Sequence, residues 1–255
     1  TREKTRKRAI RQIGQGLNFM RIDKYIQDKF NLKSRTYAEN LIKTGRVTLN
    51  GKIVSKSSTD VSDSDDVQIV NDENYASQGA YKLEKAFCDF NLDVGGKYCA
   101  DIGCSNGGFT DCLLRHGAKR VLAVDVADCA LDVRLLESGK VEFLKANARE
   151  LPSDLEKVDF LCSDVSFISL TYVLQSMFDL LKTDGEAVVL IKPQFELDKS
   201  ALNKSGIVTD EKLRKRAVEN VRKYAENVGF TILNLSTSPI RYENKNIEYL
   251  LYMKK

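Results

Sequence analysis

The sequence predicts an α/β protein in which a doubly wound, mostly parallel sheet follows a small α+β domain. Three observations predict this architecture. From Tyr81 onward, apolar runs of strand length alternate with helix-like segments, which is the pattern of parallel strands connected by helices. A glycine-rich loop follows the first of these runs. A helix–helix–hairpin pattern occupies residues 20–70, ahead of the alternating runs.

The strands of the larger domain are expected where apolar residues cluster. The expected strands are 98–102, 121–126, 141–144, 158–163 and 187–192, with one helix beginning at Gly107 and another ending at Leu136. Two later apolar runs, 230–235 and 247–253, are joined by a polar stretch. We expect these two runs to pair as an antiparallel hairpin at the edge of the sheet.

The glycine-rich loop reads Asp101-Ile102-Gly103-Cys104-Ser105-Asn106-Gly107-Gly108-Phe109. Glycines at a helix N-terminus let a ligand lie against main-chain N–H groups, where side chains would obstruct it. The spacing D-x-G-x-x-x-G-G is not the G-x-G-x-x-G of dinucleotide sites. Asp125 follows Gly103 by 22 residues, where a ribose-binding carboxylate is expected. A ribose without a diphosphate fits S-adenosylmethionine; the alternative is an ordinary strand-to-helix turn.

Two polar residues close predicted strands and are candidates for chemistry. Asp164 follows 160–163, and Lys192 follows 188–191 immediately before Pro193. Ligands in doubly wound sheets bind beyond the carboxyl ends of the strands, so both side chains are expected near a ligand. A strand-end lysine that simply reaches solvent is the alternative for Lys192.

The small domain is predicted from two amphipathic helices and a hairpin. Apolar residues have helical spacing from Ile22 to Phe30, and a second stripe, which Ser34 could cap, ends at Gly45. Strands at 46–49 and 52–54 flank Asn50-Gly51, the pair that favours a type I′ turn, and a third strand is expected at 67–70. Five basic residues around the second helix and the hairpin could contact phosphates: Lys33, Arg35, Lys43, Arg46 and Lys52. The alternative is a solvated basic surface.

Charge is distributed unevenly along the 255 residues. Residues 1–19 carry six Lys or Arg against one Glu, so they alone exceed the net charge of +4 of the whole chain. We interpret 1–19 as a tag, an overextended start or a basic tail, because Met20 resembles a natural beginning. Residues 20–70 carry a net charge of +2 and residues 71–255 a net charge of −3. The charge is therefore asymmetric between segments, and the functional alternative for 1–19 is an RNA-binding arm.

Composition sets the expectations for location and metals. The apolar run at 187–191 is far shorter than the ~20 residues that cross a bilayer, and no signal-peptide pattern follows the basic N-terminus, so a cytoplasmic protein is expected. Six cysteines lack C-x-x-C spacing, and His116 is the single histidine. We therefore expect reduced thiols and no metal.

Motifs along nearly the whole chain resemble known families. The segments R-I-D-K-Y and S-R-T-Y-A-E-N-L-I-K-T-G-R-V-T-L-N-G-K resemble the alpha-L, or S-four-type, RNA-binding domain. The segments D-I-G-C-S-N-G-G-F-T-D, S-D-V-S-F-I-S-L, L-I-K-P-Q-F-E, G-I-V, S-P-I and N-I-E-Y-L resemble the TlyA family of rRNA methyltransferases and hemolysin-named proteins. The resemblance implies an FtsJ-like, Rossmann-like S-adenosylmethionine-dependent methyltransferase sheet at 78–255, a linker at 71–77 and an RNA-binding domain at 20–70.

The resemblance also implies the site residues. The Lys-Asp-Lys-Glu set of FtsJ-type enzymes maps onto Lys82, Asp164, Lys192 and Glu248, with Lys192 orienting or deprotonating a ribose 2′-hydroxyl that attacks a sulfonium methyl. For S-adenosylmethionine, it implies Gly103, Ser105 and Gly107 at the methionine part, Asp125 at the ribose and Asn147 near the adenine. Asp101, Gly108 and Phe109 complete the expected cofactor loop. For Asn147, an ordinary surface position remains the alternative.

Two departures from the family pattern flank these residues. Gln78 and Ala80 stand where TlyA-like chains carry Arg and Gly, and residues 241–246 replace a glycine-rich approach to Glu248. Three functions follow from the sequence: a ribose 2′-O-methyltransferase acting on cytidines of rRNA in one or both ribosomal subunits, a nonenzymatic RNA-binding or ribosome-assembly factor, and a membrane-active hemolysin. The expected partner in the first two is ribosomal RNA or a ribosomal subunit.

Overall fold

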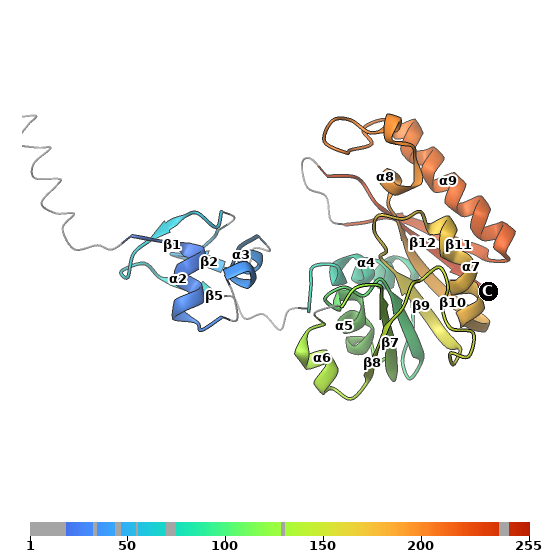
Figure 1. Cartoon of the computed structure of the whole chain (residues 1–255), viewed down its shortest axis with the longest axis horizontal. Helices are drawn as coiled ribbons and strands as arrows, with labels where there is room; N and C mark the ends of the chain where they lie inside the picture. Colours follow the sequence, from blue (N-terminus) through green and yellow to red (C-terminus); the bar gives the residue numbers. More distant parts are fainter. Residues whose placement is uncertain are drawn as a thin grey trace, which may run out of the picture. The chain divides into compact units, whose positions relative to one another are not determined.

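The computed structural model describes residues 19–32, 35–43, 47–54, 56–69, 75–128, 131–239 and 245–255. The chain divides into two compact units, Thr1–Asn74 and Tyr75–Lys255 (Figure 1).

The small unit contains the helices and the hairpin that the sequence predicts. Its elements are β1 (Met20–Arg21), α2 (Ile22–Lys29), α3 (Arg35–Lys43), β2 (Val47–Leu49), β3 (Lys52–Ile53), β4 (Asp60–Val61) and β5 (Val67–Ile69). The strand order is β3-β2-β5, with β1 paired to β4. Asn50 and Gly51 have φ values of 51° and 76°, which confirms the predicted turn between β2 and β3. The expected cap Ser34 lies outside the described residues.

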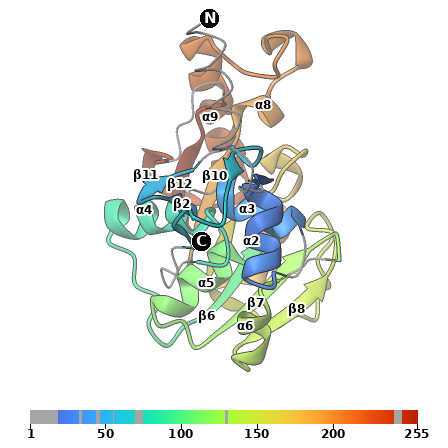
Figure 2. The same cartoon turned by 90° about the vertical axis from the view of Figure 1, so that its left-hand side faces the viewer.

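The large unit is a seven-stranded sheet of order β11-β12-β10-β9-β6-β7-β8. The strands are β6 (Tyr98–Ile102), β7 (Arg120–Asp125), β8 (Val141–Lys145), β9 (Val158–Ser163), β10 (Leu181–Ile191), β11 (Thr231–Thr237) and β12 (Tyr249–Lys254). Strand β12 is antiparallel to both β10 and β11, and the other pairs are parallel. The predicted antiparallel edge hairpin is therefore confirmed, and Figure 2 shows β6, β7 and β8 at the opposite end of the sheet.

Helices cover both faces of this sheet because its central strands are apolar on both sides. The helices are α4 (Ala80–Phe90), α5 (Gly108–Arg115), α6 (Val133–Glu137), α7 (Leu174–Leu180), α8 (Pro193–Glu196) and α9 (Glu211–Val228), with short 3₁₀ turns at Leu170–Tyr172 and Lys199–Ala201. Ala100 and Ile102 pack with residues of α7 and α9, whereas the preceding residue Cys99, which faces the other side of the sheet, packs with α4 and α5. Alternation along a strand thus divides the core into two layers.

Helix α9 was not among the elements expected from the sequence. Its buried residues are all small or β-branched: Ala217, Val218, Val221 and Ala225. Such a narrow stripe gives a weak apolar signal, although the ends of the helix are well marked. The Asp210 carboxylate accepts a hydrogen bond from Lys212 N at the start, and Gly229 has a φ of 120° at the end. Within the described part of the chain, no helix is long and apolar enough to cross a membrane.

The glycines of the 101–109 loop are required by packing within the protein. At Gly103, which has a φ of +85°, a Cβ would lie 3.2 Å from the backbone of Val165. At Gly107 it would meet Leu135 at 2.4 Å, and at Gly108 it would meet Ser77 Oγ at 2.2 Å. Besides the positive φ at Gly103 and Gly107, packing thus gives a second reason for these glycines, because protein atoms occupy the positions that side chains would take.

We expect Gly103→Ala to destabilise the protein more than Gly139→Ala. Both glycines have positive φ, but a Cβ at Gly139 would meet nothing within 4 Å. Each alanine should cost about 1–2 kcal/mol of backbone strain, and the approach of Val165 should add roughly 1 kcal/mol or more at Gly103. Urea denaturation of the two variants measures the difference; equal losses would show that the loop yields to a Cβ without cost.

Candidate active site

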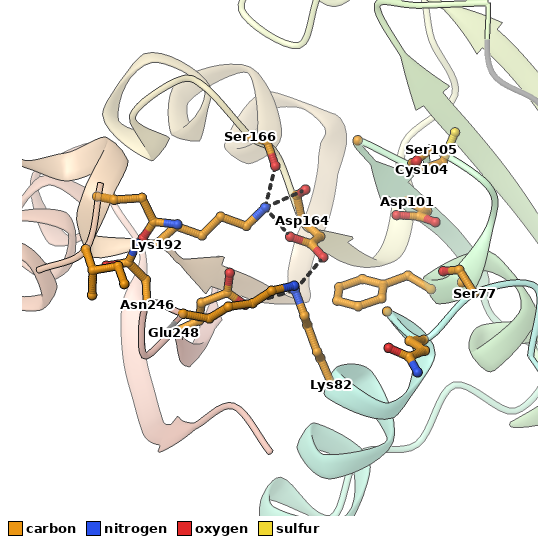
Figure 3. A pocket seen from close by; sticks show the side chains of 18 of the residues that line it. Ser77, Lys82, Asp101, Cys104, Ser105, Asp164, Ser166, Lys192, Asn246 and Glu248 are labelled. Carbon is orange, nitrogen blue, oxygen red and sulfur yellow. Dashed lines mark hydrogen bonds and ion pairs between the residues drawn. The ribbon is translucent and has the colours of Figure 1, made fainter. Parts of the chain in front are cut away.

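Four charged side chains from separate elements meet at the carboxyl edge of the sheet. Asp164 follows β9, Lys192 follows β10, Lys82 projects from the first turn of α4, and Glu248 immediately precedes β12. The parallel pairing of β9 with β6 and β10 brings the ends of these strands to one edge, and Asp164 N donates to Ile102 O at 3.2 Å. Figure 3 shows the four side chains pointing toward one another.

The four residues form one row of alternating charge. Lys192 Nζ lies 2.6 Å from Asp164 Oδ1, as a close ion pair. Asp164 Oδ2 accepts a hydrogen bond from Lys82 Nζ at 3.1 Å, and Lys82 Nζ lies 2.9 Å from Glu248 Oε2. We call this set, Lys192–Asp164–Lys82–Glu248, the charge row. Its side chains are between 8% and 19% exposed, so each charge is stabilised mainly by its neighbours in the row and little by water.

The charge row keeps Lys82 protonated. Burial by itself would lower the pKa of Lys82, but the adjacent carboxylates of Asp164 and Glu248 outweigh burial and raise the pKa above its ordinary value. The Lys82 side chain is therefore an ammonium group at neutral pH. It can donate hydrogen bonds and balance negative charge, but it is not a base.

The surroundings of Lys192 fix the direction of its amino group. The residue is 7% exposed, and Pro193 at the start of α8 turns the chain away from the sheet directly after it. Lys192 Nζ donates to Ser166 Oγ at 2.6 Å and to Asp164 O at 3.3 Å. Sequence reasoning missed Ser166, although it lies only two residues beyond Asp164 within the S-D-V-S motif.

Asn246 is a second residue that sequence reasoning did not single out. Its Oδ1 accepts from Val208 N at 2.8 Å, and its Nδ2 donates to Gly206 O at 2.9 Å. These bonds tie the segment before Glu248 to the G-I-V segment, two motifs that lie 40 residues apart in the chain. Both motifs can be recognised in the sequence, but their spacing does not indicate that they are in contact.

A cavity of about 590 Å³ opens beside the charge row, and part of the glycine loop lines it. All four residues of the charge row line it. Five of the eight expected cofactor residues also line it: Asp101, Gly103, Ser105, Gly108 and Phe109. Gln78, one of the two departures from the family pattern, lies in the same wall.

Asp101 is a fully buried carboxyl group in the cavity wall. Its Oδ2 accepts from Thr110 N at 2.9 Å and from Thr110 Oγ1 at 2.7 Å, while the buried Oδ1 has no hydrogen-bond partner. Burial raises the pKa of Asp101 to about 7, against the two bonds from Thr110 that lower it. An unpartnered buried oxygen is costly to the folded protein and is suited to accept a donor from a ligand.

The other three expected cofactor residues are not in the cavity wall. Gly107 packs against Leu131 and Leu135. The Asp125 carboxylate accepts from Ser105 N and from Ala127 N, each at 3.0 Å, so it holds the loops after β6 and β7. Asn147 is exposed beyond β8 and accepts from Arg149 N at 3.1 Å. Asp125 and Asn147 still lie at the carboxyl edge, one strand and two strands from β6.

The proposed phosphate contacts of the small unit are described only in part. Arg35 donates to Asp23 Oδ2 at 2.9 and 3.1 Å, and Asp23 is fully buried, with its pKa lowered to about 2 by hydrogen bonds from Arg21 and Arg35 against the effect of burial. The Arg35 charge is therefore largely balanced within the protein. Lys52 is exposed. The structure does not describe Lys33, Arg46 or the side chain of Lys43.

A doubly wound sheet with a glycine loop after its first strand and a charge row at its carboxyl edge defines a methyltransferase of the type that uses S-adenosylmethionine. Family comparison agrees: residues 75–255 match the FtsJ-like methyltransferase family and residues 20–67 match the S4 domain. The chain belongs to the TlyA family of FtsJ-like methyltransferases.

Relatives with both domains support this assignment. Hemolysin A of Brachyspira hyodysenteriae is 38% identical, over 91% of this chain and 99% of its own. The 16S/23S rRNA (cytidine-2′-O)-methyltransferase TlyA of Mycobacterium tuberculosis is 36% identical, over 92% of this chain and 89% of its own. A solved structure, named "putative hemolysin", from Streptococcus thermophilus is 34% identical, with a TM-score of 0.72 over 93% of this chain and 88% of its own.

We expect Asp101→Asn to become more stabilising, relative to the unchanged protein, as pH rises. The folded protein holds a proton on Asp101 up to about pH 7, whereas the unfolded chain releases it near pH 4, so the stability contributed by this group falls between these values. Asparagine keeps an acceptor for Thr110 and does not ionise. The difference in unfolding free energy should shift by roughly 2–3 kcal/mol from pH 5 to pH 7. Urea titrations at the two pH values measure it, and a constant difference would contradict the raised pKa.

Proposed function

We propose that this protein transfers a methyl group from S-adenosylmethionine to the 2′-hydroxyl of a cytidine ribose in ribosomal RNA. The observation that carries the proposal is the charge row beside the cavity that contains the glycine loop. A relative that matches nearly the whole chain, found in two strains of Mycobacterium tuberculosis, is named for methylation of cytidine 2′-oxygens in 16S and 23S rRNA. An rRNA substrate would also place the protein in the cytoplasm with the ribosome.

Polar groups in the cavity wall support S-adenosylmethionine as the cofactor. S-adenosylmethionine would supply an electrophilic methyl group on a sulfonium that is already a good leaving group. Asp101, with its unpartnered Oδ1, and the loop residues Gly103 and Ser105 would hold the methionine part. Asp125 is assigned to the ribose and Asn147 to the adenine end. Because the Asp125 carboxylate already accepts from two backbone N–H groups, its orientation is set before a ligand arrives.

The chain's own contribution is to position the hydroxyl and to manage its proton. Lys192 Nζ is held by Asp164 and Ser166 at the cavity wall, and we assign it to the substrate hydroxyl, which it orients and whose proton it accepts when it is itself deprotonated. Lys82 remains an ammonium and balances the charge that develops on the 2′-oxygen. Asp164 bridges the two lysines and fixes the distance between them.

Features outside the charge row support RNA as the substrate. The S4 match covers nearly all of the small unit's described elements. In the large unit, a second cavity is lined by Arg149, Arg216, Tyr172 and Phe167, and the Arg149 guanidinium lies 4.9 Å from the centre of the Tyr172 ring. Phe167 is 91% exposed and Tyr172 is 63% exposed. Exposed rings beside guanidinium groups are suited to unstacked bases and phosphates.

Lys192→Ala and Lys82→Ala should each lower methyl transfer by about 100-fold or more, because each removes a group assigned to the reacting oxygen. Lys85→Ala is the matched control, since Lys85 lies on the same helix as Lys82 but pairs with Asp89 at the surface. The assay uses tritiated S-adenosylmethionine with separated ribosomal subunits or rRNA from a strain lacking the gene. Label should resist alkali at one site, as ribose methylation requires.

The same assay distinguishes the alternative function. RNA binding should be retained in Lys192→Ala, because this lysine is 7% exposed and is held by Asp164 and Ser166. If the unchanged protein binds both RNA and cofactor but transfers no label to any substrate form, the function is that of a nonenzymatic RNA-binding factor. Gln78 in the cavity wall is then the first position to restore to arginine.

A further inference from the structure

Helices α4 and α5 bring together a thiol, an imidazole and a carboxylate that the proposed reaction does not use. Glu84 lies on α4, Cys112 on α5, and His116 directly after α5. One ligand atom from each lies within 4.8 Å of the others. None of the three lines the cavity of the charge row. The expectation of no metal, which rested on the cysteine spacing and the single histidine, took no account of this cluster, because Glu84 enters it from a different helix.

The three groups converge on one carboxylate oxygen. His116 Nε2 lies 3.0 Å from Glu84 Oε1, and Cys112 Sγ lies 3.6 Å from the same oxygen. The Tyr75 hydroxyl also donates to Glu84 Oε1. The thiol, the ring nitrogen and the hydroxyl thus crowd one carboxylate oxygen, which has only two lone pairs. A single cation in their midst would bind the sulfur, the nitrogen and the oxygen directly.

The two separations from the Glu84 oxygen are close to those between ligands of zinc. Zinc binds sulfur at about 2.3 Å and nitrogen or oxygen at about 2.0–2.2 Å, so two ligands of one tetrahedral ion lie about 3.3–3.6 Å apart. The observed 3.0 and 3.6 Å require only small side-chain movements. Cys112 and His116 are four residues apart, which places them on one side of the helix and its last turn.

The cluster is also held in place and open to solvent on one side. The His116 ring stacks on Phe87 at 3.7 Å between ring centres, with 4° between the planes. Cys112 is buried, while the side chains of Glu84 and His116 are 31% and 34% exposed. An ion could therefore enter past His116 and reach the thiol beneath it.

We propose that Glu84, Cys112 and His116 form a zinc site that joins α4 to α5. A water molecule completes the four ligands, and the Tyr75 hydroxyl orients the Glu84 carboxylate from outside the coordination sphere. Cys112 binds as the thiolate, its proton passing to solvent. Sulfur together with nitrogen selects zinc over magnesium or calcium. The ion would connect α4, which carries Lys82, to α5, which begins at the glycine loop. An ion that binds only to the folded protein stabilises the folded state.

The experiment uses the full chain, stripped of metal with a chelator and then titrated with Co²⁺ and with Zn²⁺. Co²⁺ should give a thiolate-to-metal absorption band at one equivalent, and Zn²⁺ should abolish that band and raise the melting temperature. Cys112→Ser should remove the band, and His116→Gln should weaken binding by about tenfold or more. Cys88→Ser is the matched control, since Cys88 is an exposed cysteine on α4, and it should bind metal like the unchanged protein.

Two results would overturn the site. One is a Co²⁺ complex without a thiolate band in the unchanged protein, which would leave the cluster as a hydrogen-bonded network only. The other is unaltered metal binding in His116→Gln, whose one-third exposed side chain makes it the safer variant if Cys112→Ser fails to fold. Melting temperatures measured without metal separate lost ligation from a general loss of stability. Because none of these readouts involves methyl transfer, they stand whether or not the proposed reaction is correct.

Discussion

The pairing of buried charges in the charge row is the constraint on which the rest of the large unit depends. Four ionisable side chains with little exposure are tolerable as ions only if each is next to its opposite. Asp164 is the central member, because its two oxygens face the two lysines. The elements that carry the row, β9, β10, α4 and the start of β12, must therefore reach the same edge of the sheet. Loss of one member would leave a buried charge uncompensated, so chemistry and stability are linked at this edge.

Side chains stabilise the loops at this edge by hydrogen bonds to main-chain groups. These hydrogen bonds keep the ends of the charge row in position. Asn246 binds the backbone at Gly206 and Val208, and so positions the segment before Glu248. Glu196 on α8 accepts from Leu170 N at 2.9 Å and from Ser169 Oγ at 2.5 Å, which closes the loop that follows Asp164. Short polar bridges of this kind stabilise irregular backbone that no strand or helix could satisfy.

The sequence was sufficient to predict the sheet and the strand ends, but not the contacts between them. Parallel strands buried on both faces are continuous apolar runs, so β6 and β9 were predicted with their exact bounds, and Asp164 and Lys192 followed as strand-end residues. Helix α9 was missed because alanine and valine form its buried stripe. The packing of Gly107 could not be predicted because Leu131 and Leu135, which it contacts, lie more than twenty residues away. Ser166 and Asn246 gain their roles only from tertiary neighbours.

Helix α4 shows how one short element can serve two sites. Lys82 and Glu84 are two residues apart, which turns their side chains to different sides of the helix. Lys82 faces the carboxyl edge and enters the charge row, whereas Glu84 faces α5 and meets Cys112 and His116. A divalent cation bound there would be neutralised by Glu84 and the Cys112 thiolate together, so the completed site would carry no net charge. The position of Lys82 could then be stabilised from the far side of its own helix.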